Sequence, residues 1–178
     1  AQRGIARSFQ IPQLYKELTV TENMLVAIAS QSGKLSFWKP ARNDAALARA
    51  DELLQRFELA AHAQRKVAEL PGGVRKLLDI AMALTRQPRV LLLDEPTSGV
   101  SADEKFPMME TVMRALSHEA MTVLFVEHDM DIVQRFSDRV AAFYSGRIIA
   151  DGHPDEVLAH PDVQRHVTGE IREVAAHA

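Results

Sequence analysis

The stretch Val90-Leu-Leu-Leu-Asp94-Glu95-Pro96 decides the fold. Four consecutive apolar residues are typical of a strand that is covered on both faces of a sheet. Both carboxylates then lie at the carboxyl end of the strand, where open α/β sheets bind ligands. Asp94 is of the type that holds Mg²⁺, and Glu95 is of the type that orients an attacking water during phosphoryl transfer. Taken alone, the pattern fits an acidic pair at the protein surface equally well or better.

Strands and helices alternate on both sides of this stretch. The apolar runs Ile5–Phe9 and Thr122–Val126 predict a short strand and a second buried strand. The segments Val140–Tyr144 and Arg147–Ala150 predict a hairpin around Ser145-Gly146. Alternation of this kind is typical of an α/β fold with a mostly parallel sheet.

Local signals predict where the helices begin. Thr19–Glu22 and Ser101–Glu104 each have the spacing of a capping box, and Asp129 is a third N-cap candidate. Pro107 is expected to distort the first turns of its helix. Pro154 is expected to open a last amphipathic helix.

The composition limits the classes of protein to consider. The 178 residues suffice for one domain with a core. The net charge of -3 does not favour nucleic-acid binding, which uses a basic face, and the absence of cysteine excludes disulfides and thiolate metal sites. No apolar run is long enough to span a bilayer, so any membrane role requires a partner.

Three further segments carry residues of the types that bind phosphate. Leu70-Pro71-Gly72-Gly73 opens a helix whose free N–H groups and dipole favour an anion. His128 ends the second predicted buried strand, and Gln10 follows the first apolar run. Taken singly, a Gly-Gly pair before a helix is usually just a turn, and a lone histidine at a strand end is more often a structural hydrogen-bonding residue. Gln10 by itself is indistinguishable from any loop glutamine. Their order along the chain is more informative than any of them alone.

In this order and spacing the segments resemble the ATP-binding-cassette (ABC) family along essentially the whole chain. The resemblance implies an α/β P-loop NTPase-like core with an inserted α-helical subdomain, and ATP and Mg²⁺ as ligands. It implies Asp94 as a Mg²⁺ ligand, Glu95 as the catalytic base and His128 as the switch histidine. It assigns Gln10 to the Q-loop, where the side chain contacts metal and water. The other nucleotide-binding residues that it implies are those of the family signature and of the D-loop, namely Pro71, Gly72, Gly73, Ser98, Gly99 and Ser101.

Further segments are similar to the branched-chain amino-acid importer group within this family, namely Arg7–Gln10, Leu18–Asn23, Val126–Met130 and His160–Val163. The group implies a second ABC ATPase subunit, transmembrane permease subunits and, indirectly, a periplasmic binding protein as partners, and no nucleic acid. It implies a peripheral position on the cytoplasmic face of the inner membrane. Two alternatives stay open: a non-hydrolysing ABC-like interaction or regulatory module, and a cassette protein of DNA repair or translation. The intact carboxylate pair argues against the first, and the lack of a basic surface argues against the second.

The chain departs from the family pattern in two places. It has no P-loop, because its only Gly-Lys pair, Gly33-Lys34, has Ile28 where the first glycine belongs and Leu35 where Ser or Thr belongs. We therefore expect an upstream stretch to supply the P-loop and a strand beside the Asp94 strand, and the 178-residue chain alone to be inactive and partly uncovered. Pro71 replaces the usual signature serine and supplies neither a hydroxyl nor an N–H.

The organisation expected from the resemblance has four parts. Residues 1–18 form a partial core with the Q-loop, and residues 19–70 form the α-helical subdomain. Residues 71–152 form the ATPase core with the signature, the Walker B strand, the D-loop and the switch histidine. Residues 153–178 form a C-terminal helix and tail.

Overall fold

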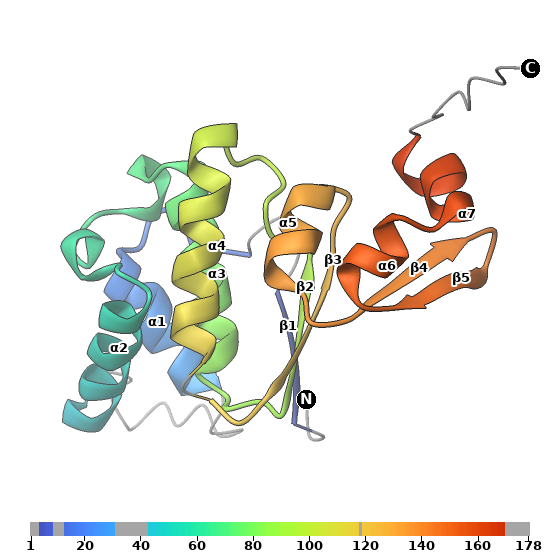
Figure 1. The fold of residues 1–178 in the computed structure, drawn as a ribbon. Coiled ribbons are helices and arrows are strands. Elements are labelled where there is room, and N and C mark those ends of the chain that lie inside the picture. The colour runs from blue at the N-terminus through green and yellow to red at the C-terminus, as the bar shows by residue number, and fades with distance from the viewer. Residues whose placement is uncertain (1–3, 9–12, 31–42, 118, 170–178) are drawn as a thin grey trace, which may run out of the picture. The chain divides into compact units, whose positions relative to one another are not determined.

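The computed structural model describes residues 4–8, 13–30, 43–117 and 119–169 (Figure 1). The chain divides into two compact units, Ala1–Val126 and Glu127–Ala178. The first holds a parallel sheet covered by helices, and the second holds a hairpin with short helices.

The sheet of the first unit consists of β1 (Ile5–Ser8), β2 (Val90–Asp94) and β3 (Thr122–Val126), which pair in parallel in the order β1-β2-β3. This parallel sheet between helices agrees with the predicted α/β fold. The expectation of a further strand beside the Asp94 strand is wrong, because β2 is hydrogen-bonded to β1 on one side and to β3 on the other. Among the described strands, the open edges of the sheet belong to β1 and β3.

The helices of this unit gather on one side of the sheet (Figure 1). They are α1 (Val20–Ala29), α2 (Asp44–Arg56), α3 (Gly72–Leu84) and α4 (Ala102–Leu116), with two 3₁₀ turns, η2 (Ala60–His62) and η3 (Val67–Glu69), between α2 and α3. They cover the face of the sheet on which Ala6 and Leu91 lie in register.

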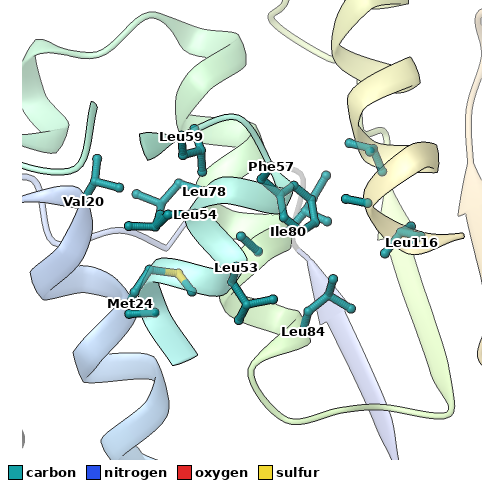
Figure 2. Close-up of a cluster of buried hydrophobic side chains, with 14 of the residues drawn as sticks. Val20, Met24, Leu53, Leu54, Phe57, Leu59, Leu78, Ile80, Leu84 and Leu116 are labelled. Carbon is teal, nitrogen blue, oxygen red and sulfur yellow. The ribbon is translucent and has the colours of Figure 1, made fainter. Parts of the chain in front are cut away.

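The core of the first unit lies between these helices and the covered face of the sheet. Its largest wholly buried side chains include Met24, Leu53, Phe57, Leu78, Ile80 and Leu84 (Figure 2). Full burial of such a side chain contributes about 1.5–3 kcal/mol relative to an exposed one, so this cluster is the main source of stability in the unit.

The opposite face of the sheet is apolar but open. Leu124 is 54% exposed and Val126 is 57% exposed, whereas Val123 and Phe125 pack against the core. The prediction that Thr122–Val126 is a buried strand is therefore wrong. The strand alternates between the core and solvent because the helices of its unit all lie on the other face. Solvent reaches apolar surface here, as expected for a partly uncovered core.

The helix starts follow the predicted signals in part. Thr19 and Glu22 form a complete capping box before α1, with the Glu22 N–H 3.2 Å from the Thr19 hydroxyl oxygen. The prediction of a second capping box at Ser101 and Glu104 is wrong. The Ser101 hydroxyl donates to the Glu104 carboxylate at 2.8 Å and caps no backbone N–H of α4. Pro107, which was expected to distort the first turns, lies inside α4, and the helix continues through it without a break.

The second unit contains α5 (Met130–Phe136), β4 (Val140–Tyr144), β5 (Arg147–Gly152), α6 (Pro154–Leu158), α7 (Pro161–Val163) and a π-helical turn, η4 (Gln164–Thr168). β4 and β5 form the predicted antiparallel hairpin. Its two turn residues, Ser145 and Gly146, have φ angles of 49° and 77°. Positive φ at both central residues is what a type I′ turn requires. Asp129 caps α5 as predicted, and its carboxylate accepts the Asp131 N–H at 3.2 Å.

The single last helix expected after Pro154 is broken into short pieces. Pro161 lacks an N–H and restricts His160 to an extended backbone, so α6 ends at Leu158 before helical turns resume. The tail beyond Gly169 lies outside the described residues. The four-part organisation expected from the sequence stays a prediction. No helix in the described part of the chain is long and apolar enough to cross a membrane.

Candidate functional site

The Asp94-Glu95 pair lies at the carboxyl end of β2. Asp94 is the last residue of the strand. Glu95 follows with φ = 45°, a left-handed conformation that is uncommon for residues other than glycine. The Glu95 N–H donates to the Val126 carbonyl at 2.9 Å, and the Glu95 carbonyl accepts the Ser98 N–H at 3.1 Å. The backbone of Glu95 is thus held on both sides, and strained residues held in this way concentrate at functional sites.

Asp94 is paired with an arginine to which sequence reasoning gave no role of its own. Arg7 Nη2 donates to Asp94 Oδ2 at 2.6 Å, and the two side chains are 53% and 33% exposed. Strand register explains the contact, because Arg7 aligns with Leu92 and therefore shares a face with Asp94 two residues further along β2. An exposed pair of this kind contributes about 0–1 kcal/mol to stability. Its main consequence is a positive charge beside Asp94.

The signature helix and the D-loop lie against each other. A Cβ at Gly72 would meet the Gly99 carbonyl oxygen at 3.1 Å, so only glycine fits at this position without displacing a neighbour. Gly99 has φ = 75°, a conformation that glycine adopts freely. Because the Ser98 N–H donates to the Glu95 carbonyl, the same loop also contacts the residue expected to act as base. The start of α3 is therefore linked to Glu95 through the D-loop backbone.

Pro71 is the N-cap of α3 and makes no side-chain capping bond. Its carbonyl accepts the Arg75 N–H at 3.1 Å, which closes the first helical turn. A Cβ at Gly73 would meet Val100 Cγ1 at 3.7 Å, an ordinary contact. The N–H groups of the first turn have no partner within the helix. Gly72 and Gly73 can therefore donate to an anion even though Pro71 cannot.

A buried polar contact joins β1 to α3, and sequence reasoning missed it. The Ser8 hydroxyl donates to the Asp79 carboxylate, and both residues are almost wholly buried. Lys76, one turn earlier on α3, is also buried. Ser8 lies on the same inward face of β1 as Ala6, but its partner on α3 follows only from the packing of the helix on the sheet. The contact ties the strand that leads toward Gln10 to the helix that begins at the signature.

The structure brings some of the predicted residues together within the first unit. The Asp94-Glu95 pair, the D-loop and the signature glycines are neighbours within the first unit. His128 belongs to the second unit, and its imidazole is 75% exposed. The backbone N–H of His128 donates to the Glu127 carboxylate at 3.2 Å. Ser101 contacts Glu104, and Gln10 lies outside the described residues.

Among the described residues, Asp94 is the candidate ligand for a metal at this site. No group of three or more His, Cys, Asp or Glu side chains gathers anywhere in that part of the chain. Mg²⁺ does not require one, because it is usually held by one or two carboxylates together with substrate phosphates. Asp94 fits this role, since its carboxylate is partly exposed and only Oδ2 accepts a hydrogen bond from Arg7.

The family model described as ABC transporter matches residues 1–98, more than half of the chain. The chain belongs to the ABC transporter family. Among curated relatives of this ABC chain, the high-affinity branched-chain amino acid transport ATP-binding protein LivG of Salmonella typhimurium is 37% identical. That match spans 178 residues and covers 96% of this chain and 69% of LivG.

Solved ABC structures share the fold. An ATP-binding cassette of an ABC transporter in its ADP conformation is 32% identical with a TM-score of 0.76, and the match covers 95% of this chain and 70% of that chain. A subunit of the cbiONQ ABC transporter complex from Clostridium perfringens is 28% identical with a TM-score of 0.75, and the match covers 92% and 62% of the two chains. The family and the α/β ABC fold predicted from the sequence are thus confirmed, and with them a nucleotide-binding ATPase class that is coupled to transport.

Proposed function

We propose that this ABC chain is the ATP-binding and hydrolysing part of an importer subunit for branched-chain amino acids. The observation that carries the proposal is the Asp94-Glu95 pair at the end of β2, with Glu95 held in a left-handed conformation beside the D-loop. The similarity to LivG supports the choice of cargo class.

On this proposal, the two carboxylates have different roles in ATP hydrolysis. Glu95 orients and polarises the attacking water and accepts its proton. Its fixed backbone supports this role, because a base must be held in one position to act on one water. Asp94 holds Mg²⁺, which when bound offsets the negative charge of the phosphates.

The remaining predicted residues act across a dimer on this proposal. A second ABC ATPase subunit, identical or related, packs head to tail around two ATP molecules. The N–H groups of Gly72 and Gly73 then donate to the γ-phosphate bound by the partner, with the D-loop residues 98–101 beside them. His128 and Gln10 sense the γ-phosphate from within each subunit. The contact of Gly72 with the D-loop supports this arrangement, since it couples the signature of one nucleotide site to Glu95 of the other.

A pocket in the first unit is the proposed docking place for the permease. It holds ≈ 280 Å³, and its lining includes Tyr15, Val26, Ala27, Met82, Ala83 and Arg86. Ser30, Asp79 and Thr85 also line it, so its walls mix apolar and polar side chains, which suits a short amphipathic helix from a membrane subunit. The pocket also borders Arg7 and Gln13, which flank the segment of Gln10. The subunit then lies on the cytoplasmic face of the inner membrane and meets a periplasmic binding protein only through the permease.

Replacing Glu95 by Gln in the full-length protein tests the assignment of the base. The amide keeps the size of the side chain but cannot accept the proton, so we expect the rate of ATP hydrolysis to fall by about 10²–10⁴-fold while ATP binding persists. The matched control is Glu52→Gln on α2, which removes a carboxylate that pairs with Arg49 away from β2. The 178-residue chain without a P-loop is expected to show no hydrolysis. Unchanged hydrolysis in Glu95→Gln would contradict the proposal.

A further inference from the structure

The ion pair between Arg7 and Asp94 places a permanent positive charge at the carboxylate proposed to bind the metal. The guanidinium reaches Asp94 Oδ2 at 2.6 Å from a neighbouring strand. Among the described residues, Arg7 is the only one whose side chain pairs with that carboxylate. Both side chains are open to solvent in part, so an ion or a nucleotide can approach them.

We propose that Arg7 makes Asp94 selective for a divalent cation that arrives with a nucleotide over the free cation. A free cation at Asp94 has a charge of about +2 and is repelled by the adjacent guanidinium. The complex of the same cation with ATP has a net charge of about −2 and is attracted by it. One arginine therefore shifts the two affinities in opposite directions. In the absence of nucleotide, Arg7 itself neutralises Asp94.

The size of the effect follows from distance and screening. A guanidinium that contacts one carboxylate oxygen lies only a few ångströms from a metal bound at the other. For charges of this size at such a separation in a solvent-exposed site, we expect a change of roughly three- to tenfold in each dissociation constant. Because ions screen exposed charges, both changes should shrink when the ionic strength rises to about 0.5 M.

This inference rests on the proposed role of Asp94 as a metal ligand, and the two can fail separately. Asp94→Asn in the full-length protein removes the carboxylate charge. If the binding of Mn²⁺ alone and of Mn²⁺ with a nucleotide is the same in Asp94→Asn and in the wild type, Asp94 is not a metal ligand and the proposed function loses its metal site. If Asp94→Asn weakens binding but substitutions of Arg7 change nothing, only the selectivity role is overturned.

The experiment measures Mn²⁺ binding by electron paramagnetic resonance, which reports free Mn²⁺ directly and needs no turnover. Full-length wild type, Arg7→Met and Arg7→Lys are titrated with Mn²⁺ alone and with Mn²⁺ plus a non-hydrolysable ATP analogue. Methionine removes the charge and keeps an unbranched side chain, while lysine keeps the charge. The control is Arg49→Met, which deletes the same charge from a pair of similar length, 2.7 Å, on α2.

We expect Arg7→Met to bind Mn²⁺ alone about three- to tenfold more tightly and Mn²⁺ with the analogue more weakly by a similar factor. Arg7→Lys and Arg49→Met should stay close to wild type in both titrations. In an Asp94→Asn background, Arg7→Met should no longer strengthen the binding of Mn²⁺ alone. A change of both affinities in the same direction would indicate a purely structural role for Arg7, and no change would show that its charge does not reach the site. Either result overturns the inference.

Discussion

Glu95 offers a direct test of the strained backbone at the candidate site. Its φ of 45° places a residue with a Cβ in the left-handed region. A left-handed conformation costs a residue other than glycine about 1–2 kcal/mol. Glycine avoids this cost but loses about 0.5–1 kcal/mol more backbone entropy on folding than alanine does. The difference predicts that Glu95→Gly is more stable than Glu95→Ala by about 0.5–1 kcal/mol.

The comparison of glycine with alanine isolates the effect of backbone conformation on the free energy of unfolding. Both substitutions remove the carboxylate and all its contacts, so side-chain interactions cancel between the two variants. The matched control is Glu110, an exposed residue inside α4, where the backbone is helical. There the order should reverse, with Gly less stable than Ala by about 0.5–1 kcal/mol.

The assay is urea unfolding followed by far-ultraviolet circular dichroism, with the four variants measured side by side. Equal slopes of free energy against urea would show that the variants expose similar surface on unfolding, so that the midpoints report stability. If alanine stabilises the protein relative to glycine at position 95 by as much as it does at position 110, Glu95 is not strained. The fold would then not hold the backbone of Glu95 in a costly conformation.

Two further predictions concern stability away from the candidate site. Phe57→Ala, which empties a wholly buried position of the core (Figure 2), should lower the free energy of unfolding by about 3–5 kcal/mol, whereas the same change at the 65% exposed Phe143 should cost less than about 1 kcal/mol. Urea unfolding measures both, and similar losses would contradict the assigned core. In the second unit, the hydrogen bond from Arg139 holds the pKa of Asp151 below its ordinary value. A carboxyl with a lowered folded-state pKa stabilises the fold above its unfolded pKa and loses that contribution as the pH falls through the folded value, so the hairpin should weaken below about pH 4. Arg139→Met should remove this part of the acid dependence in a pH series of unfolding curves, and an unchanged series would refute it.

Local signals were sufficient where structure depends on near neighbours. Thr19 and Glu22 are three residues apart, and their capping box forms as predicted. The turn at Ser145-Gly146 follows from backbone preferences of two residues. The break at Pro161 was equally local and could have been predicted from the missing N–H. The order of the motifs was enough to identify the family, because spacing along the chain is visible without a structure.

Contacts between distant segments were not predictable in the same way. Arg7 and Asp94 are 87 positions apart, and only the register of β1 on β2 brings them together. The hydrogen bond between Ser8 and Asp79 likewise depends on how α3 crosses the sheet. The apolar run Thr122–Val126 suggested burial on both faces, but the run itself does not say whether the second face is covered. Register and packing are properties of the fold, and a single sequence states them only indirectly.

On the proposed function, Glu95 is the base of a transport ATPase. The most direct measurement follows phosphate release from ATP and leucine uptake together, in vesicles that contain the full-length protein with its permease, for wild type and Glu95→Gln. We expect both activities to fall together in Glu95→Gln while ATP remains bound. Continued hydrolysis at the wild-type rate would contradict the claim, and so would leucine uptake that does not depend on Glu95.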